Sequence, residues 1–389
     1  MAYRILTRDE HFTAPGPKRI LTLDGGGLKG IVTLGFLARV ESLLRERHGN
    51  DAGFRLAHYF DLIAGTSTGA IIAAALAKGM TVAEVTAYYL QMGTKVFKSS
   101  WFRHGAVLAR YDDDRLRDLL KEVLGEATTL GDASLLTGVM FVTKRVDTGS
   151  PWPLGNNPRG RYFGTPADRH YVGNGDYPLW QVVRASTAAP TFFDPESFTI
   201  TEACSDRQAV HGTFVDGGVS PFNNPSLQAF MYATLAGYRV QWPKGADNLL
   251  VCSVGTGMVD PARAPAKIAA AGAVQALMSL MDDCASLVET MMQWMAGGTK
   301  VKTIDRELGD LRGDLLTSTP LFTYSRYDVS FTADCVNALV PGLSAKQIAS
   351  LSEMDETDNL QVWKSIGEKA AETTVEAADF PPQFNLPEA

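Results

Sequence analysis

Two segments near the start of the chain share one design, in which a short apolar strand runs through a turn of small residues into a helix. In the first, residues 20–23 (ILTL) lead into 24-DGGGLKG-30, after which apolar residues recur at helical spacing up to Leu44. In the second, residues 58–79 (HYFDLIAGTSTGAIIAAALAKG) contain an apolar strand, a small-residue turn and an Ala-rich helix. Units of this kind place strands side by side beneath helices, so they predict an α/β fold.

The rest of the chain continues the pattern. Strand-like runs occur at 139–146, 213–218 and 248–257, and helical patterns at 83–97 and 114–124. We therefore predict a three-layer α/β sandwich with a mostly parallel central sheet covered by helices on both faces. Residues 146–180 are predicted to form loops. The 112-DDD-114 cluster lacks the Gly and terminal Glu of a calcium loop and is interpreted as a helix N-cap with first-turn acids.

The domain organisation predicted from these patterns is simple. Residues 1–17 form an irregular leader, and residues 18–389 form a single domain in which 258–389 is a mainly helical C-terminal extension. The methionine-rich stretch 277–295 is interpreted as a packing helix. The alternative is an apolar lid or membrane-contacting surface, because methionine adapts to irregular apolar partners.

Composition excludes several classes of function. The chain has 45% hydrophobic and 20% charged residues and a net charge of −7, which argues against sequence-independent binding of nucleic acid. The N-terminal residues contain no apolar run typical of a secretory signal. The four cysteines (Cys204, Cys252, Cys284 and Cys335) are scattered, as expected for reduced thiols of a cytoplasmic protein.

The second turn, 65-GTSTG-69, is a G-x-S-x-G sequence between a strand and a helix. A sharp turn at this point forces the side chain of the central residue outward, at the edge of the sheet where open α/β sheets bind ligands. Ser67 is therefore predicted to be a nucleophile, although a bare G-x-S-x-G also occurs in ordinary tight turns.

A nucleophilic serine needs a base. His170 and His211 could serve in a Ser–His–Asp triad, but each lies in a polar stretch with nothing to mark it, and no histidine follows His211. A second candidate is Asp216 in 214-FVDGG-218, at the end of a short strand. An Asp-Gly turn without function would look the same, so the residues alone leave both bases open.

The glycines of the first turn, Gly25, Gly27 and Gly30, also satisfy the G-x-G-x-x-G signature of dinucleotide-binding proteins. Such a fold requires an acid at the end of the second strand, whereas Asp61 lies at its beginning. Glycines at a helix N-terminus offer backbone N–H donors, which suit the oxyanion formed when Ser67 attacks an ester. A nucleotide-binding oxidoreductase nevertheless remains an alternative.

Taken together, 24-DGGGLKG-30, 65-GTSTG-69 and 216-DGG-218 resemble the three sequence blocks of the patatin-like phospholipases and acyl hydrolases. Further stretches between residues 88 and 257 resemble the family as well. Where many members have Arg in the glycine block, this chain has Lys29, which keeps the charge but lacks the bidentate guanidinium.

The resemblance implies a serine acyl hydrolase that degrades lipids by cleaving fatty-acyl esters of glycerophospholipids. It implies a catalytic dyad of Ser67 and Asp216, and an oxyanion hole formed by Gly25, Gly26 and Gly27, with no metal or cofactor. The predicted location is cytoplasmic with peripheral membrane contact, and regulation by a ligand or partner is a further hypothesis. The alternatives are a non-catalytic lipid-binding or storage protein on the same fold and a Ser–His–Asp esterase.

Overall fold

The computed structural model describes residues 3–97, 112–203, 208–259 and 269–388 of the 389-residue chain. Within these ranges, nine strands form one sheet in the order β5-β6-β3-β2-β1-β7-β9-β8, with β4 paired to β3 outside this path. The strands are β1 (Lys18–Leu23), β2 (Leu62–Thr66), β3 (Gly138–Arg145), β4 (Ser150–Gly155), β5 (Glu196–Thr201), β6 (Val210–Asp216), β7 (Leu249–Val254), β8 (Gly297–Lys300) and β9 (Thr323–Tyr327).

The centre of this sheet is parallel. Strands β3, β2, β1, β7, β9 and β8 pair with their neighbours in parallel, whereas β4, β5 and β6 pair antiparallel. The carboxyl ends of the parallel strands therefore meet at one edge of the sheet, and the turns that carry the glycine block and Ser67 both leave from that edge.

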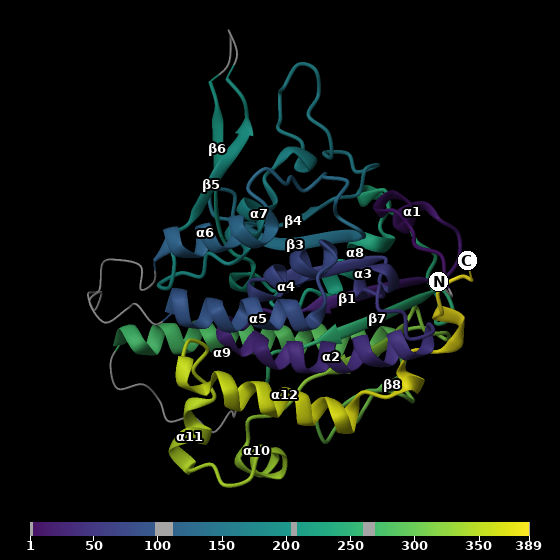
Figure 1. Cartoon of the computed structure of the whole chain (residues 1–389), viewed down its shortest axis with the longest axis vertical. Helices are drawn as coiled ribbons and strands as arrows, with labels where there is room; N and C mark the ends of the chain where they lie inside the picture. The colour runs from purple at the N-terminus through teal and green to yellow at the C-terminus, as the bar shows by residue number, and fades with distance from the viewer. Residues whose placement is uncertain (1–2, 98–111, 204–207, 260–268, 389) are drawn as a thin grey trace.

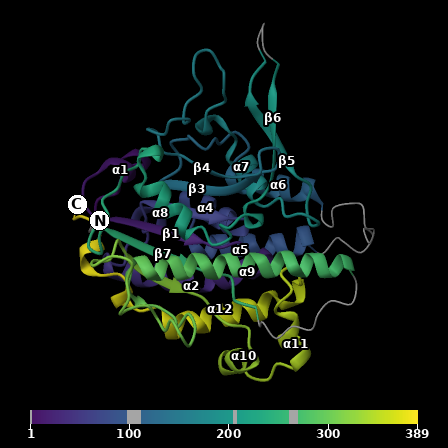
Figure 2. The same cartoon turned by 180° about the vertical axis from the view of Figure 1, so that it is seen from behind.

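Helices cover the two faces of the sheet. Figure 1 shows α4 and α5 on one side, and Figure 2, the view from behind, shows α9 on the other. Helix α12 packs on α2, and α8 packs on α9. The helices are α1 (Arg8–Thr13), α2 (Gly30–Arg47), α3 (Leu56–Tyr59), α4 (Thr68–Ala77), α5 (Val82–Met92), α6 (Asp113–Leu124), α7 (Leu179–Ser186), α8 (Ser226–Thr234), α9 (Ala269–Met295), α10 (Ala333–Leu339), α11 (Ala345–Ser350) and α12 (Leu360–Thr374).

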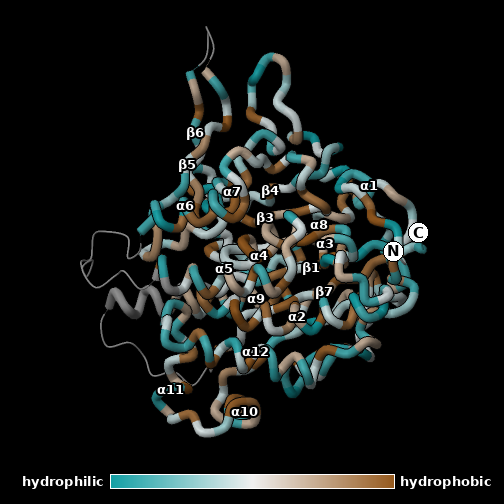
Figure 3. Tube along the Cα trace, viewed as in Figure 1, coloured by the Kyte–Doolittle hydropathy of each residue, from teal (hydrophilic) through white to brown (hydrophobic). Residues whose placement is uncertain are grey.

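Alternate residues of the central strands belong to two hydrophobic cores. Leu21 and Ile63 are buried in the core beneath α2 and α4, while Ile20 and Leu62 are buried in the core shared with α8 and α9. Because neighbouring residues of a strand point to opposite faces, a strand buried on both sides must be apolar throughout. Figure 3 shows this as hydrophobic colour along the central strands. The predicted three-layer α/β sandwich is confirmed.

Three segments differ from the sequence-based expectation. The supposed irregular leader contains α1, which begins with a capping box between Thr7 and Glu10. The predicted loops at 146–180 include β4. The C-terminal region, predicted as mainly helical, adds β8 and β9 to the parallel sheet. Polar side chains dominate β9 (TYSRY), so its sequence lacks the apolar run by which the other parallel strands were recognised.

Other expectations can be compared directly. Asp112 is the N-cap of α6 and accepts hydrogen bonds from the amides of Asp114 and Arg115, as predicted. Cys252, Cys284 and Cys335 are free thiols, and Cys204 lies outside the described residues. None of the described helices combines the length and apolar character needed to cross a bilayer.

Candidate active site

Ser67 stands in a strained turn between β2 and α4. Its backbone has φ 54° and ψ −127°. Residues other than glycine rarely adopt this conformation, and such strain is typical of functional sites. The flanking glycines are needed for close packing: a Cβ on Gly65 would lie 2.3 Å from the carbonyl oxygen of Gly69, and one on Gly69 would lie 2.2 Å from that of Leu23. The turn therefore has the features of a nucleophile elbow.

Asp216 reaches this turn because β6 and β2 share one edge of β3. Strand β4 occupies the other edge over Met140–Arg145, so both β2, which pairs with residues 138–142, and β6, which pairs with residues 143–145, must lie on the remaining edge. Since β6 runs antiparallel to β3, its last residue meets the end of β2. The Oγ of Ser67 donates a hydrogen bond of 2.6 Å to the Oδ2 of Asp216.

The environment of Asp216 makes it more basic than an ordinary aspartate. Its side chain is almost fully buried, with the residue 3% exposed, and the amide of Gly218 donates to Oδ1 at 2.7 Å. Burial raises the pKa of Asp216 to about 6, although the hydrogen bonds from Ser67 and Gly218 act in the opposite direction. At neutral pH the carboxylate is ionised and can accept a proton from the serine hydroxyl.

The glycine turn after β1 lies beside Ser67. Gly26 and Gly27 line the same cavity as Ser67, and Gly27 has φ 60°, in the left-handed region that favours glycine. The amide of Gly25 instead donates to the carbonyl of Asn223 at 3.2 Å. Sequence reasoning grouped all three glycines, but the structure directs the Gly25 amide away from the cavity.

A cavity of about 90 Å³ opens on Ser67 and Asp216. Met278 and Met281 of α9 contribute to its wall, which links the methionine-rich helix to the site. The remaining apolar lining includes Ile71, Met92, Leu116, Phe192, Phe193 and Met354.

The alternative bases lie elsewhere. His170 bonds to Asp168, His211 contacts Thr199, and neither lines the cavity at Ser67. His104 lies outside the described residues. Asp61 stands before β2, at the opposite edge of the sheet, where Arg19 and His11 bind its carboxylate. The position of Asp61 gives the dinucleotide interpretation no support.

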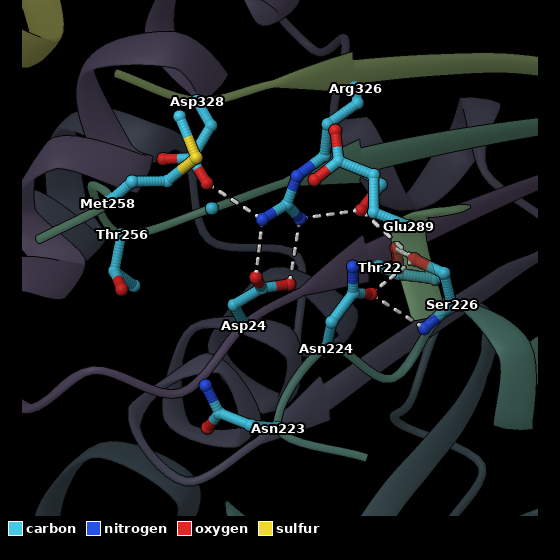
Figure 4. Close-up of polar contacts among 12 residues, drawn as sticks. Thr22, Asp24, Asn223, Asn224, Ser226, Thr256, Met258, Glu289, Arg326 and Asp328 are labelled. Atoms are coloured by element: carbon cyan, nitrogen blue, oxygen red, sulfur yellow. Dashed lines mark hydrogen bonds and ion pairs between the residues drawn. The ribbon is translucent and has the colours of Figure 1, made fainter. Parts of the chain in front are cut away.

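Two supporting residues escaped sequence reasoning. The Oγ of Ser186, at the end of α7, accepts a hydrogen bond of 2.9 Å from the amide of Ser67. Arg326 of β9 binds Asp24, the residue before the glycine turn, as Figure 4 shows. Ser186 lies in 185-ASTAAPTFFDP-195, a stretch that resembles the family, but nothing in it indicated a bond to Ser67, and Arg326 lies in no recognisable motif. The one unusual property of Arg326 is that it is an arginine buried in a parallel strand, and this burial is known only from the three-dimensional structure.

Over the described residues, no group of three or more His, Cys, Asp or Glu side chains is placed to hold a metal ion. The groups that the site offers are the hydroxyl of Ser67, the carboxylate of Asp216 and the backbone amides of the glycine turn. An activated hydroxyl beside backbone donors is suited to acyl transfer.

Comparison with known proteins points the same way. A family model described as patatin-like phospholipase matches residues 21–230, more than half of the 389-residue chain. This segment begins in β1 and ends in α8, so it contains the glycine turn, Ser67 and Asp216. It stops before β7, β8 and β9.

Individual relatives match a similar part of the chain. A cGAMP-activated phospholipase of Vibrio cholerae serotype O1 is 33% identical over 219 residues, covering 54% of this chain and 56% of the relative. A protein of the same name from Escherichia coli (strain TW11681) is 31% identical and covers 54% and 53%. Patatin-T5 of Solanum tuberosum is 30% identical and covers 55% and 53%. The matches span about half the length of these relatives.

Proposed function

The chain belongs to the patatin-like phospholipase family, and from that premise we propose that it is a serine acyl hydrolase that cleaves fatty-acyl esters of glycerophospholipids through Ser67 and Asp216. The single observation that carries the proposal is the 2.6 Å hydrogen bond between the strained Ser67 and the buried carboxylate of Asp216. A serine in an ordinary turn would not be expected to combine a strained backbone with a hydrogen bond to a buried carboxylate.

In the first step, the Oγ of Ser67 attacks the ester carbonyl while its proton passes to Asp216. A bond forms between Oγ and the carbonyl carbon, and the carbonyl oxygen becomes an oxyanion. Backbone amides of Gly26 and Gly27 are the proposed donors to that oxyanion. The amide of Gly25, included in the sequence-based prediction, would first have to give up its bond to Asn223.

In the second step, the bond between the carbonyl carbon and the glycerol oxygen breaks, and the leaving oxygen takes the proton from Asp216. Water then attacks the acyl–Ser67 ester and gives a proton to the same carboxylate. Collapse of this second intermediate releases the fatty acid and returns the proton to Oγ. One carboxylate therefore serves alternately as base and acid, which a pKa of about 6 favours near neutral pH.

The test is hydrolysis of phospholipid vesicles followed by mass spectrometry of the products. Wild type is expected to release fatty acid, and Ser67→Ala and Asp216→Asn are expected to release almost none. Ser197→Ala is a matched control, because it removes a serine hydroxyl of β5 that donates to the carbonyl of Gly212 and does not line the cavity at Ser67. Wild-type turnover in both site variants would contradict the proposal.

Labelling separates the enzyme from a non-catalytic lipid-binding protein on the same fold. A fluorophosphonate should react with Ser67 in stoichiometric amount, because the probe requires an activated serine. Failure of a folded wild-type sample to react would favour the binding protein.

Regulation by a ligand or partner is a finer part of the proposal. It is supported by the name of two relatives, cGAMP-activated phospholipase. Vesicle hydrolysis would be measured with and without cGAMP. Full activity of the purified chain without any added ligand or partner would contradict regulation of this kind. Peripheral membrane contact, also part of the proposal, would be measured by sedimentation with the same vesicles.

A further inference from the structure

Strand β1 has a buried arginine–aspartate pair at each end. At its beginning, Arg19 binds Asp61 through Nε at 2.9 Å and Nη2 at 3.2 Å. Just beyond its other end, Asp24 accepts hydrogen bonds from Nη1 of Arg326 at 3.0 Å and from Nη2 at 2.7 Å. The two pairs are alike in bidentate geometry and burial, but only the second adjoins the turn proposed to hold the oxyanion.

Arg326 is connected to the loop that follows β7 through Asp328, the residue just after β9. Its Nη2 donates to Oδ2 of Asp328 at 2.7 Å, and Oδ1 of Asp328 accepts from the amide of Gly257 at 2.9 Å. The neighbouring Thr256 donates through Oγ1 to the carbonyl of Gly25 at 3.2 Å. Figure 4 shows the guanidinium between the two carboxylates. Arg326 and Asp328 together therefore join the segment before the glycine turn to the segment that contacts the turn itself.

The fit between Thr256 and the turn is close. A Cβ added to Gly26 would lie 2.2 Å from Oγ1 of Thr256, so a displacement of the loop after β7 is transmitted directly to Gly26. Asn223 completes the arrangement, since its Nδ2 donates to the carbonyl of Gly25 at 3.3 Å. Gly25 is thus held by three hydrogen bonds to two residues, Thr256 and Asn223. Arg326 fixes the segment before the turn directly and the loop after β7 through Asp328.

From this geometry we propose that Arg326, which lies outside the residues matched by the family model, is a positioning residue that aligns the amides of Gly26 and Gly27 with the carbonyl attacked by Ser67. The inference rests on the proposed hydrolase function. It assigns a role in that function to the C-terminal region, through β9.

The charges around Arg326 explain why an arginine is required. Three acidic side chains face it: Asp24, Asp328 and Glu289, the last of which is also paired with Lys302 at 2.6 Å. Burial alone would lower the pKa of the guanidinium, but Asp24 and Asp328 raise it well above its ordinary value. A lysine could neutralise one carboxylate, yet it lacks the planar fork that binds two at once.

The test compares variants of the two arginines on a soluble ester, p-nitrophenyl butyrate, so that membrane binding does not enter. We expect Arg326→Met to lower kcat by about 100-fold, the size of effect that a small misplacement of catalytic groups produces, with KM changed much less. Arg326→Lys should fall between this variant and wild type. The matched control Arg19→Met breaks the pair at the other end of β1, and it should lower thermal stability while kcat of the folded protein stays at the wild-type value.

Chemical rescue makes the result specific. The side chain of Arg326 borders a cavity of about 310 Å³, so a free guanidinium ion can reach the space left by Arg326→Ala. Added guanidinium, at concentrations far below those that unfold the protein, should restore part of kcat in a saturable manner, and it should not raise kcat of wild type or of Arg19→Met.

The outcomes are distinct. A wild type that is inactive both with and without cGAMP, and that also fails to react with a fluorophosphonate, would overturn the proposed hydrolase and leave nothing to position. If wild type is active, two results would overturn the positioning role alone. In the first, Arg326→Lys and Arg326→Met keep the wild-type kcat. In the second, their loss of kcat matches that of Arg19→Met. If Arg326→Met does not fold, the kcat of Arg326→Lys and the titration of Arg326→Ala with guanidinium decide the question. The proposal is contradicted if Arg326→Lys has no reduced kcat and guanidinium does not raise the kcat of Arg326→Ala.

Discussion

Opposite edges of the sheet contain two buried aspartates with opposite electrostatics. At the amino edge, Asp61 accepts hydrogen bonds from Nδ1 of His11 at 2.9 Å, from Nε of Arg19 at 2.9 Å and from the amide of Arg19 at 2.8 Å. Burial alone would raise the pKa of Asp61, but Arg19, His11 and Lys18 hold it well below its ordinary value.

At the carboxyl edge, Asp216 is as thoroughly buried, but no ion pair to its carboxylate occurs among the described residues, and the charge of Arg184 lowers its pKa less than burial raises it. A hydroxyl and one backbone amide bind its two oxygens, and its pKa rises to about 6. The difference lies in the partners and not in the degree of burial. An aspartate matched by cations stabilises the fold and is a very weak base. An aspartate buried among neutral donors destabilises the ionised fold, but it can take up a proton near neutral pH.

The largest expected effect concerns turnover. Asp216→Asn should lower kcat by about 10⁴-fold, because the amide cannot accept the serine proton. The measurement is kcat on p-nitrophenyl butyrate. Asp61→Asn, assayed at a temperature at which it is folded, should keep the wild-type kcat. Equal losses in the two variants would break the functional half of the comparison.

The second effect concerns stability at the amino edge. Asp61→Asn should lower the free energy of unfolding at pH 7 by about 3–5 kcal/mol, because it leaves the buried Arg19 without its counter-charge. Since the pKa of Asp61 is depressed in the folded state, its contribution is present above the ordinary pKa of aspartate and is lost as the pH falls through the folded-state value.

Chemical denaturation provides the measurement. Asp114→Asn, which changes an exposed acid of α6, is the control and should alter the free energy of unfolding by less than about 0.5 kcal/mol. A loss for Asp61→Asn no larger than that of the control would mean that the cations at the amino edge contribute little.

The third effect has the opposite sign. Asp216→Asn should raise the free energy of unfolding at pH 8 by up to about 3 kcal/mol, the equivalent of a pKa shift from the ordinary value to about 6. A raised folded-state pKa gives stability that is full below the ordinary pKa and is lost as the pH rises through 6. The gain of the variant should therefore disappear near pH 4. If the variant is less stable than wild type at pH 8, the hydrogen bonds that Asp216 accepts from Ser67 and Gly218 stabilise the fold by more than burial of its charge destabilises it.

The smallest effect is the pH dependence of activity. Because Asp216 must be ionised to act as a base, kcat/KM on the soluble ester should rise about tenfold from pH 5 to pH 8, with its midpoint near pH 6. Product release measured by chromatography avoids the titration of the coloured product. Asp61→Asn should give the same profile. A rate independent of pH across this range would argue against a carboxylate base with this pKa.

Sequence reasoning predicted the parts of this site that local chemistry marks. Gly65, Ser67 and Gly69 form a short motif between an apolar strand and an Ala-rich helix, and Asp216 precedes two glycines at the end of a strand. The apolar strands of the parallel core were predicted for the same reason, since burial on both faces leaves a continuous hydrophobic run. The catalytic roles of Ser67 and Asp216 remain predictions.

The rest depends on contacts between distant segments. Arg326 lies in TYSRY, a strand without the apolar run of the central strands, and its place beside Asp24 follows from the pairing of β9 with β7. The bond from the Gly25 amide to Asn223 could not be anticipated, because it joins two loops separated by almost 200 residues. No periodicity or motif within either segment encodes such a contact.

The end-to-end placement of β2 and β6 along one edge of β3 has a consequence for how this enzyme family can be lengthened or redesigned. Both reactive side chains are anchored to β3, which lies between them in the sequence, so the segments before and after β3 can change length without moving either side chain. Insertions in the surface loops of those segments should be tolerated. Sliding β6 by a single residue along β3 would instead turn the carboxylate to the opposite face of the sheet.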